Sequence, residues 1–205
     1  MGSLVLAGGA SSRMGTDKAL LVYHGMPQVH HLVKLLKSVA SPTFVSVRPS
    51  QVVERGFCGL SLLPDLAEGI GPLAGLLAAF GHDPNRAWLV VAVDLPWVER
   101  GTFERLLAAR DPALFATCYR IPSTDLLEPV CAIYEPKIYS VLQEAQRKKR
   151  YSLMLLRDVP IRLVAPRHER ELCGVNDLEE YRAAREGPPR IPPEFNPPSN
   201  PRTPT

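Results

Sequence analysis

A run of seven apolar residues, AWLVVAV at positions 87–93, restricts the possible folds more than any other stretch of the sequence. A strand that is apolar throughout is typical of one that is covered on both faces. Other strand-like runs occupy residues 4–7, 43–47, 60–63, 113–119, 129–135 and 159–164. Apolar residues with helical spacing lie between or after them, at 27–39, 73–80, 103–107, 138–145 and 177–185. This alternation predicts a three-layer, Rossmann-like α/β fold with a mostly parallel sheet and helices on both faces.

The length and the proline content predict the domain boundaries. With 205 residues, of which 45% are hydrophobic, the chain is long enough for one well-buried domain. From residue 187 the sequence reads GPPRIPPEFNPPSNPRTPT, in which prolines are too frequent for a helix or a central strand. We therefore expect a folded domain at residues 1–186 and a proline-rich, disordered tail at residues 187–205.

The charge and the cysteines limit the classes of function. A net charge of +3 favours small anionic ligands over nucleic acids, which usually require a far more basic surface. The four cysteines show no paired spacing, so they predict neither a zinc site nor disulfide bonds and fit a reducing compartment. No signal peptide is evident, and no apolar run approaches the roughly twenty residues of a membrane-spanning helix. These features predict a soluble, cytoplasmic protein that does not bind membranes.

The second informative stretch is LVLAGGASSRMGTDKAL, residues 4–20. Its apolar start leads into Gly8 and Gly9, which allow a sharp turn and a close approach of the backbone to a ligand. Arg13 and Lys18 add cations beside this glycine loop, although either could be an ordinary exposed side chain. The combination is typical of a phosphate-binding site. Its spacing matches neither the Walker motif nor the dinucleotide fingerprint, which argues against kinase-type and dehydrogenase sites.

Three polar residues lie where parallel α/β sheets bind their ligands, at the carboxyl ends of the strands. Asp65 follows the strand at 60–63, Asp94 follows the strand at 87–93, and Asn176 precedes the last helix. Asp94 could hold Mg²⁺, which favours one or two carboxylates together with phosphate oxygens and water. An aspartate there could also simply cap a turn. The phosphate-type glycine loop makes the metal-binding interpretation the stronger one.

Five stretches, in the same order, resemble one family of enzymes. They are LAGGASSRMGTDKAL at 6–20, DLAEGIGPLAGLLAAF at 65–80, VVAVDLPWV at 90–98, EPVCAIYEP at 128–136 and GVNDLEEY at 174–181. Together they resemble the molybdenum cofactor guanylyltransferases of the MobA type, over nearly all of residues 1–186. The resemblance implies a nucleotide-diphospho-sugar-transferase-like fold. It also implies transfer of GMP from GTP to the terminal phosphate of molybdopterin, with release of pyrophosphate and with Mg²⁺ as cofactor.

The resemblance further implies roles for individual residues. The expected GTP-binding residues are Leu6, Ala7, Gly8, Gly9, Lys18, Arg48, Asp65, Gly71 and Asp94. Asp94 is also the expected metal ligand, and the expected catalytic residues are Lys18, Asp94 and Arg13. Asn176 is expected on the pterin side of the site. Two positions depart from the family pattern: Arg48 stands where an asparagine is common, and Gly174 stands at the first position of an Asn-x-Asn pair.

Two alternative functions stay open at this point. The motifs LAGG and GPLAG (residues 71–75) are associated with guanine, whereas related cytidylyltransferases tend to read AAG and lack the second motif. A cytidylyltransferase, or another nucleotidyltransferase of the same fold, is the nearer alternative. The other is a non-catalytic adapter that binds molybdoenzyme maturation proteins through the proline-rich tail. Because the pterin phosphate is already an anion, the expected reaction requires alignment and charge neutralisation rather than a general base.

Overall fold

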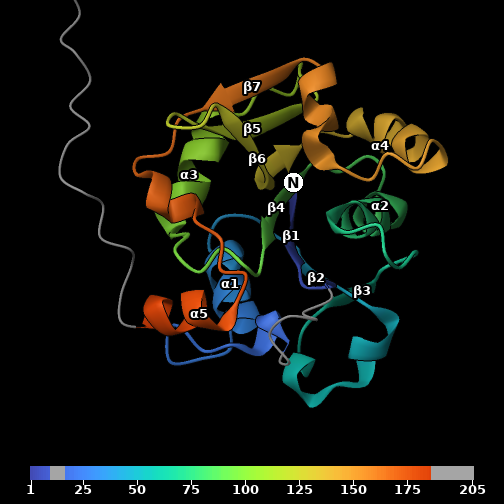
Figure 1. Cartoon of the computed structure of the whole chain (residues 1–205). Helices are drawn as coiled ribbons and strands as arrows, with labels where there is room; N and C mark the ends of the chain where they lie inside the picture. The colour runs from blue at the N-terminus through green and yellow to red at the C-terminus, as the bar shows by residue number, and fades with distance from the viewer. Residues whose placement is uncertain (10–16, 186–205) are drawn as a thin grey trace, which may run out of the picture.

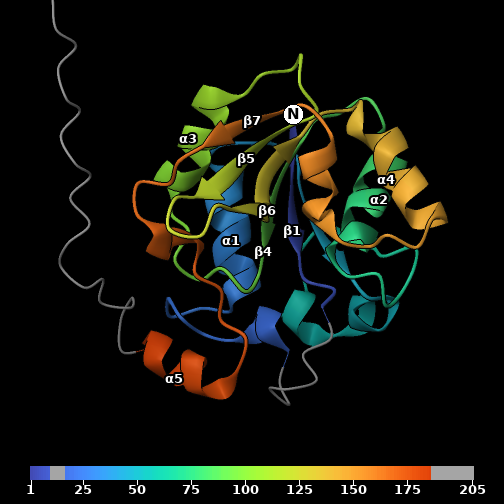
Figure 2. The same cartoon turned by 45° about the horizontal axis from the view of Figure 1, so that its top comes forward.

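The computed structural model of the chain describes residues 1–9 and 17–185. The prediction for Arg13 and the prediction of a disordered tail at 187–205 both lie outside the described residues. Figures 1 and 2 show the described part as one central sheet with helices on both of its faces, which confirms the predicted three-layer α/β fold.

In the part of the chain that the structure describes, seven strands form the sheet. They are β1 (Gly2–Leu6), β2 (Thr43–Val47), β3 (Leu62–Pro64), β4 (Trp88–Ala92), β5 (Ala116–Ile121), β6 (Leu126–Tyr134) and β7 (Ile161–Val164). Their order is β3-β2-β1-β4-β6-β5-β7. All neighbouring pairs are parallel except those of β6, which is antiparallel to both β4 and β5. The mostly parallel sheet predicted from the sequence is therefore confirmed.

Of the five α-helices in the described residues, four cover the sheet, two on each face. The helices are α1 (Gln28–Lys37), α2 (Pro72–His82), α3 (Arg100–Ala109), α4 (Ile138–Arg147) and α5 (Leu178–Arg185). Residues of α2 and α4 share one hydrophobic cluster, and residues of α1 and α3 share the other. The short helix α5 lies apart from both faces, near the end of the sheet from which the loops after β1 and β4 emerge (Figures 1 and 2).

The alternation of side chains along β4 explains why its sequence is apolar throughout. Trp88 and Val90 belong to the cluster on the α2 and α4 face, whereas Leu89 and Val91 belong to the cluster on the opposite face. All four side chains are completely buried. A central strand with helices on both sides has no solvent-facing position, which favours an apolar residue at every place along it.

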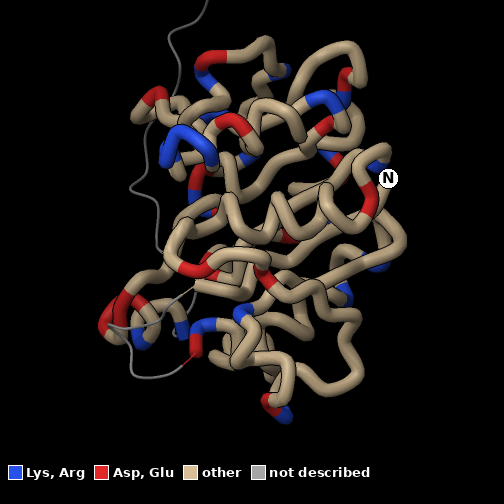
Figure 3. The backbone as a smooth tube through the Cα atoms, turned by 90° about the vertical axis from the view of Figure 1, so that its right-hand side faces the viewer, with Lys and Arg blue, Asp and Glu red and all other residues tan. Residues whose placement is uncertain are grey.

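Charged residues are distributed unevenly among the strands, and the cysteines are unpaired. The four strands β1 to β4 contain no charged residue, whereas β5, β6 and β7 carry Arg120, Glu128 and Arg162. Figure 3 shows where the charged residues lie along the backbone. All four cysteines are free thiols; Cys118 and Cys131 are buried, and Cys58 and Cys173 are exposed. Among the described residues, no helix has the length and apolar character needed to cross a membrane.

The structure also contains features that the apolar pattern did not predict. Residues 1–9 and 17–185 include five short 3₁₀ helices: η1 (Lys18–Leu20), η2 (Pro49–Val53), η3 (Arg55–Phe57), η4 (Leu153–Asp158) and η5 (Glu169–Leu172). Segments of three to six residues are too short for a recurring apolar spacing to reveal them. The strand predicted at 113–119 begins later, at Ala116, because the preceding residues form a turn.

A buried ion pair joins the end of α3 to the residue that follows β6. Arg110 donates from Nε to Glu135 Oε1 (2.6 Å) and from Nη2 to Oε2 (2.9 Å), and Glu135 is 2% exposed. We expect Arg110→Ala to lower the free energy of unfolding by roughly 1–3 kcal/mol, because it leaves a buried carboxylate without its donor. Chemical denaturation measures this value. Arg162→Ala is the control, since the Arg162–Asp111 pair is exposed and should contribute less than about 1 kcal/mol; equal losses in both variants would contradict the expectation.

Candidate active site

One pocket brings together eight of the nine residues that the family resemblance implies for nucleotide binding. It lies at the carboxyl ends of β1 and β4, next to the first turn of α2. The predicted residues that line it are Leu6, Ala7, Gly8, Gly9, Lys18, Asp65, Gly71 and Asp94. The glycine loop and the acid after β4 therefore open onto the same space, as binding of one polyphosphate requires.

Gly8 allows the backbone after β1 to approach the carboxylate of Asp65. A Cβ atom at Gly8 would lie 2.2 Å from Asp65 Oδ2, so no side chain fits there unless Asp65 moves. Asp65 is held in place because its Oδ1 accepts a hydrogen bond from Ser46 Oγ at 2.5 Å. Burial raises the pKa of Asp65, while the Ser46 hydroxyl and the Arg48 charge act in the opposite direction. This places an acceptor-only carboxylate at the wall of the pocket.

The first turn of α2 forms another wall. Gly71 is the N-cap residue and Pro72 the first helical residue, and both line the pocket. One turn later, a Cβ atom at Gly75 would lie 2.4 Å from Ser46 Oγ and 2.5 Å from Leu6 Cδ2. The glycine therefore lets α2 pack closely against β1 and β2. The GPLAG motif thus serves close packing, and it also supplies the helix start that faces the pocket.

Asp94 is the residue best suited to hold a cation. Its Oδ1 is buried and has no hydrogen-bond partner among the described residues. Burial raises the pKa of Asp94, and the positive charge of Lys18 lowers it. A buried carboxylate oxygen without a donor is costly unless a cation or a ligand satisfies it. The described residues contain no group of three or more acidic, histidine or cysteine side chains that could enclose an ion, so phosphate and water would supply its other ligands.

Lys18 links the glycine loop to the segment before α5. Its ammonium donates to Val175 O (2.9 Å) and to Asn176 Oδ1 (3.0 Å). The amide of Val175 in turn donates to Asp94 O at 2.8 Å. The structure thus gathers three predicted residues, Lys18, Asp94 and Asn176, around one point at the end of the sheet. Asp17 fixes the start of η1, where it accepts from the Ala19 amide at 2.9 Å.

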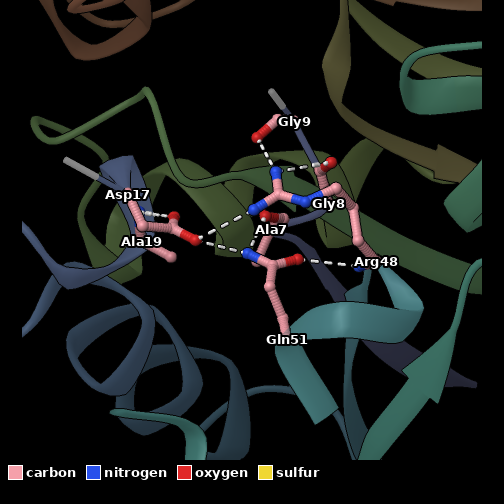
Figure 4. A network of polar contacts seen from close by, with 7 residues as sticks. All are labelled: Ala7, Gly8, Gly9, Asp17, Ala19, Arg48 and Gln51. Atoms are coloured by element: carbon pink, nitrogen blue, oxygen red, sulfur yellow. Dashed lines mark hydrogen bonds and ion pairs between the residues drawn. The ribbon is translucent and has the colours of Figure 1, made fainter. Parts of the chain in front are cut away.

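Arg48 occupies a different place from the other predicted residues. Its guanidinium donates to Gly8 O and Gly9 O and forms an ion pair with Asp17 (Figure 4). It is not among the described residues that line the pocket. The prediction that Arg48 binds GTP directly stays a prediction.

Two further residues near the site were missed by sequence reasoning. Gln51 is completely buried behind the glycine loop, where it donates to Ala7 O at 3.2 Å. Glu128 lies on β6, which runs antiparallel to β4. The register pairs Val91 with Cys131, and three residues further in the direction of β4 the same register brings Asp94 opposite Glu128. Burial is the main cause that raises the pKa of Glu128 to about 7, and the charge of Asp94 adds to it. Glu128 is the first residue of the EPVCAIYEP motif. A charged residue at the start of this largely apolar stretch was the signal that the sequence offered.

Comparison with known proteins identifies similar sequences. A family model described as the MobA-like NTP transferase domain matches residues 3–164. A molybdenum cofactor biosynthesis bifunctional protein of Synechocystis is 33% identical over 179 residues, which make up 87% of this chain and 52% of that protein. The chain thus spans about half the length of that relative. A probable molybdenum cofactor guanylyltransferase of Clostridium perfringens is 26% identical over 189 residues, or 86% of this chain and 92% of the relative.

Solved structures share the fold. The molybdopterin-guanine dinucleotide biosynthesis protein A of Archaeoglobus fulgidus superposes with a TM-score of 0.76 at 20% identity, covering 91% of this chain and 97% of that one. A Mycobacterium tuberculosis protein solved in complex with manganese superposes with a TM-score of 0.65 at 18% identity, covering 90% and 97%. At these identities the likeness establishes the architecture of the sheet and its helices.

Proposed function

The chain belongs to the MobA-like NTP transferase family, and from this membership we propose that it transfers GMP from GTP to the terminal phosphate of molybdopterin. The products are the guanine dinucleotide form of the cofactor and pyrophosphate. Membership of the family makes the chain a nucleotidyltransferase of molybdenum cofactor biosynthesis. The guanylyltransferase name of its Clostridium relative supports the choice of GTP and molybdopterin as substrates.

The single observation that carries this proposal is the shared pocket. Gly8 and Gly9 on one wall and Asp94 on another face the same space. A triphosphate in that space could receive hydrogen bonds from the loop amides and approach Asp94 at the same time. Amides at a glycine turn are suited to bind phosphate oxygens.

The proposed reaction is an attack of one phosphate on another. An oxygen of the acceptor's terminal phosphate forms a bond to the α-phosphorus of GTP. The bond between that phosphorus and the bridging oxygen breaks, and its electron pair leaves with pyrophosphate. The attacking oxygen is already ionised, so no side chain has to remove a proton.

The residues of the chain then align the reactants and balance charge. The loop amides and Lys18 bind and orient the triphosphate, and Asp65 accepts from donor groups of the nucleoside. A divalent cation on Asp94 would supply positive charge next to the phosphates when bound; we propose Mg²⁺. The buried Oδ1 of Asp94, which has no hydrogen-bond partner among the described residues, supports this assignment.

Initial rates with different triphosphates test the choice of base. We expect kcat/KM for GTP to exceed that for CTP by about tenfold or more, since a pocket that pairs with the donors and acceptors of one base leaves polar groups unpaired with another. The assay records pyrophosphate release with molybdopterin as acceptor, Mg²⁺ present and GTP, CTP or ATP as donor. A preference for CTP would contradict the proposed guanylyl transfer and favour the cytidylyltransferase alternative.

A further inference from the structure

The carbonyl groups of the glycine loop accept hydrogen bonds from two side chains, those of Arg48 and Gln51. Arg48 Nη1 donates to Gly8 O at 3.2 Å and also to Gly9 O. Its other terminal nitrogen, Nη2, lies 3.4 Å from Asp17 Oδ2. One guanidinium therefore contacts the chain both at the end of β1 and just before Lys18, as Figure 4 shows.

Gln51 completes this arrangement. Its amide nitrogen donates to Ala7 O (3.2 Å) and to Asp17 Oδ2, and its amide oxygen accepts from the Arg48 backbone N–H at 2.7 Å. The side chain is completely buried, so water does not replace these contacts. We call Asp17, Arg48 and Gln51 the loop-support network.

The geometry of the peptide bond gives these contacts a consequence at the pocket. In a planar trans peptide, the C=O of one residue and the N–H of the next point in opposite directions. Gln51 holds the Ala7 carbonyl and Arg48 holds the Gly8 carbonyl. The amides of Gly8 and Gly9, on the same two peptides, are thereby turned away from the Gln51 and Arg48 donors.

The network also acts on Lys18. Asp17 Oδ1 accepts from the Ala19 amide and so caps η1, which begins at Lys18. The other carboxylate oxygen of Asp17, Oδ2, accepts hydrogen bonds from Gln51 Nε2 and Arg48 Nη2. The position of the lysine therefore depends on the same three side chains as the direction of the loop amides.

We propose that Arg48 and Gln51 are positioning residues, which act through the loop carbonyls and Asp17 to aim the Gly8 and Gly9 amides and Lys18 at the triphosphate. This inference rests on the proposed function. It assigns to Arg48 a role behind the loop rather than a contact with the nucleotide. Arginine suits the role because its planar fork can donate to several acceptors at once, whereas lysine carries a single point charge.

Arg48→Lys separates positioning from a direct charge contact. If the planar guanidinium of Arg48 positions the loop, Arg48→Lys should weaken GTP binding about tenfold or more, nearly as much as Arg48→Ala. Gln51→Glu, which keeps the shape of the side chain but removes both donors, should have a similar effect. Calorimetric GTP affinity and the KM values for both substrates are the readouts, and the KM for the acceptor should stay within about twofold. Arg55→Lys, at an exposed arginine in η3, is the matched control.

Hydrogen exchange tests the network without any nucleotide. Peptides that cover residues 4–9 and 17–20 should exchange faster in Arg48→Lys and Gln51→Glu than in the wild type, and should be unchanged in Arg55→Lys. Wild-type affinity for GTP in Arg48→Lys combined with loss in Arg48→Ala would overturn the proposal, because charge alone would then suffice. Unchanged exchange in both network variants would also overturn it. A wild-type chain that binds no GTP would refute the proposed function, whereas faster exchange would still support the network.

Discussion

Asp94→Asn is expected to lower kcat for nucleotidyl transfer by about a thousandfold, the largest effect of any single substitution considered for this chain. The substitution keeps the shape of the side chain but removes the charge that would hold a divalent cation beside the phosphates. Pyrophosphate release at saturating GTP, measured over a range of Mg²⁺ concentrations, gives the value. Chelation of the metal should bring the wild type down to a similar rate.

The fold should tolerate this change. Burial raises the pKa of Asp94, which means that the folded chain disfavours its charged form. In the absence of metal and nucleotide, the melting temperature of Asp94→Asn should therefore equal or exceed that of the wild type. Asp158→Asn, at an exposed aspartate, is the matched control and should leave the rate unchanged. Normal turnover by Asp94→Asn with Mg²⁺ would show that this carboxylate does not bind the metal.

Gly8→Ala is expected to weaken GTP binding by about a hundredfold. The new methyl group would lie 2.2 Å from Asp65 Oδ2, and the hydrogen bond from Ser46 prevents the carboxylate from moving without a further loss. Asp65 must then leave its place at the wall of the pocket. A hydrogen bond to a charged group contributes about 1.5–3 kcal/mol, which corresponds to the expected range of affinity. Calorimetric titration with GTP measures the loss.

The neighbouring glycine provides a close control. A Cβ atom at Gly9 would meet nothing within 4 Å, so Gly9→Ala should leave Asp65 in place and bind GTP more tightly than Gly8→Ala does. Asp65→Ala should reproduce most of the effect of Gly8→Ala. The double variant should lose little more than either single variant, because both remove the same contact. Fully additive losses would mean that Gly8 acts on the nucleotide independently of Asp65.

The parts of the site that lie at strand ends could be predicted from the sequence. An apolar run followed by an aspartate marks the end of a buried strand, and parallel strands bring such ends to one edge of the sheet. That reasoning correctly placed the glycine loop and Asp94 at one pocket. It needed only local pattern and a general rule about topology.

The direction of β6 could not be read from the apolar pattern, since the alternation of side chains is the same for both strand directions. The signal was instead the short connection between β5 and β6, residues 122–125, because a parallel crossover needs a dozen or more residues. The direction of β6 is what places Glu128 next to Asp94.

The loop-support network could not be predicted for another reason. Gln51 and Asp17 are 34 residues apart, and their contact depends on how η2 packs behind the glycine loop. No period or motif encodes such a contact. The sequence did single out Arg48, because an arginine stands where the family commonly has an asparagine. Where its side chain points became clear only from the hydrogen bonds to Gly8 O and Gly9 O.

The two outermost strands of the sheet have a consequence for the behaviour of the protein at high concentration. β3 has three residues and ends in Pro64, which lacks an N–H group, and β7 has only four residues. Short edge strands, one of which lacks a backbone N–H donor, offer little template for pairing with a strand of another molecule. The folded chain is thus protected against edge-to-edge aggregation.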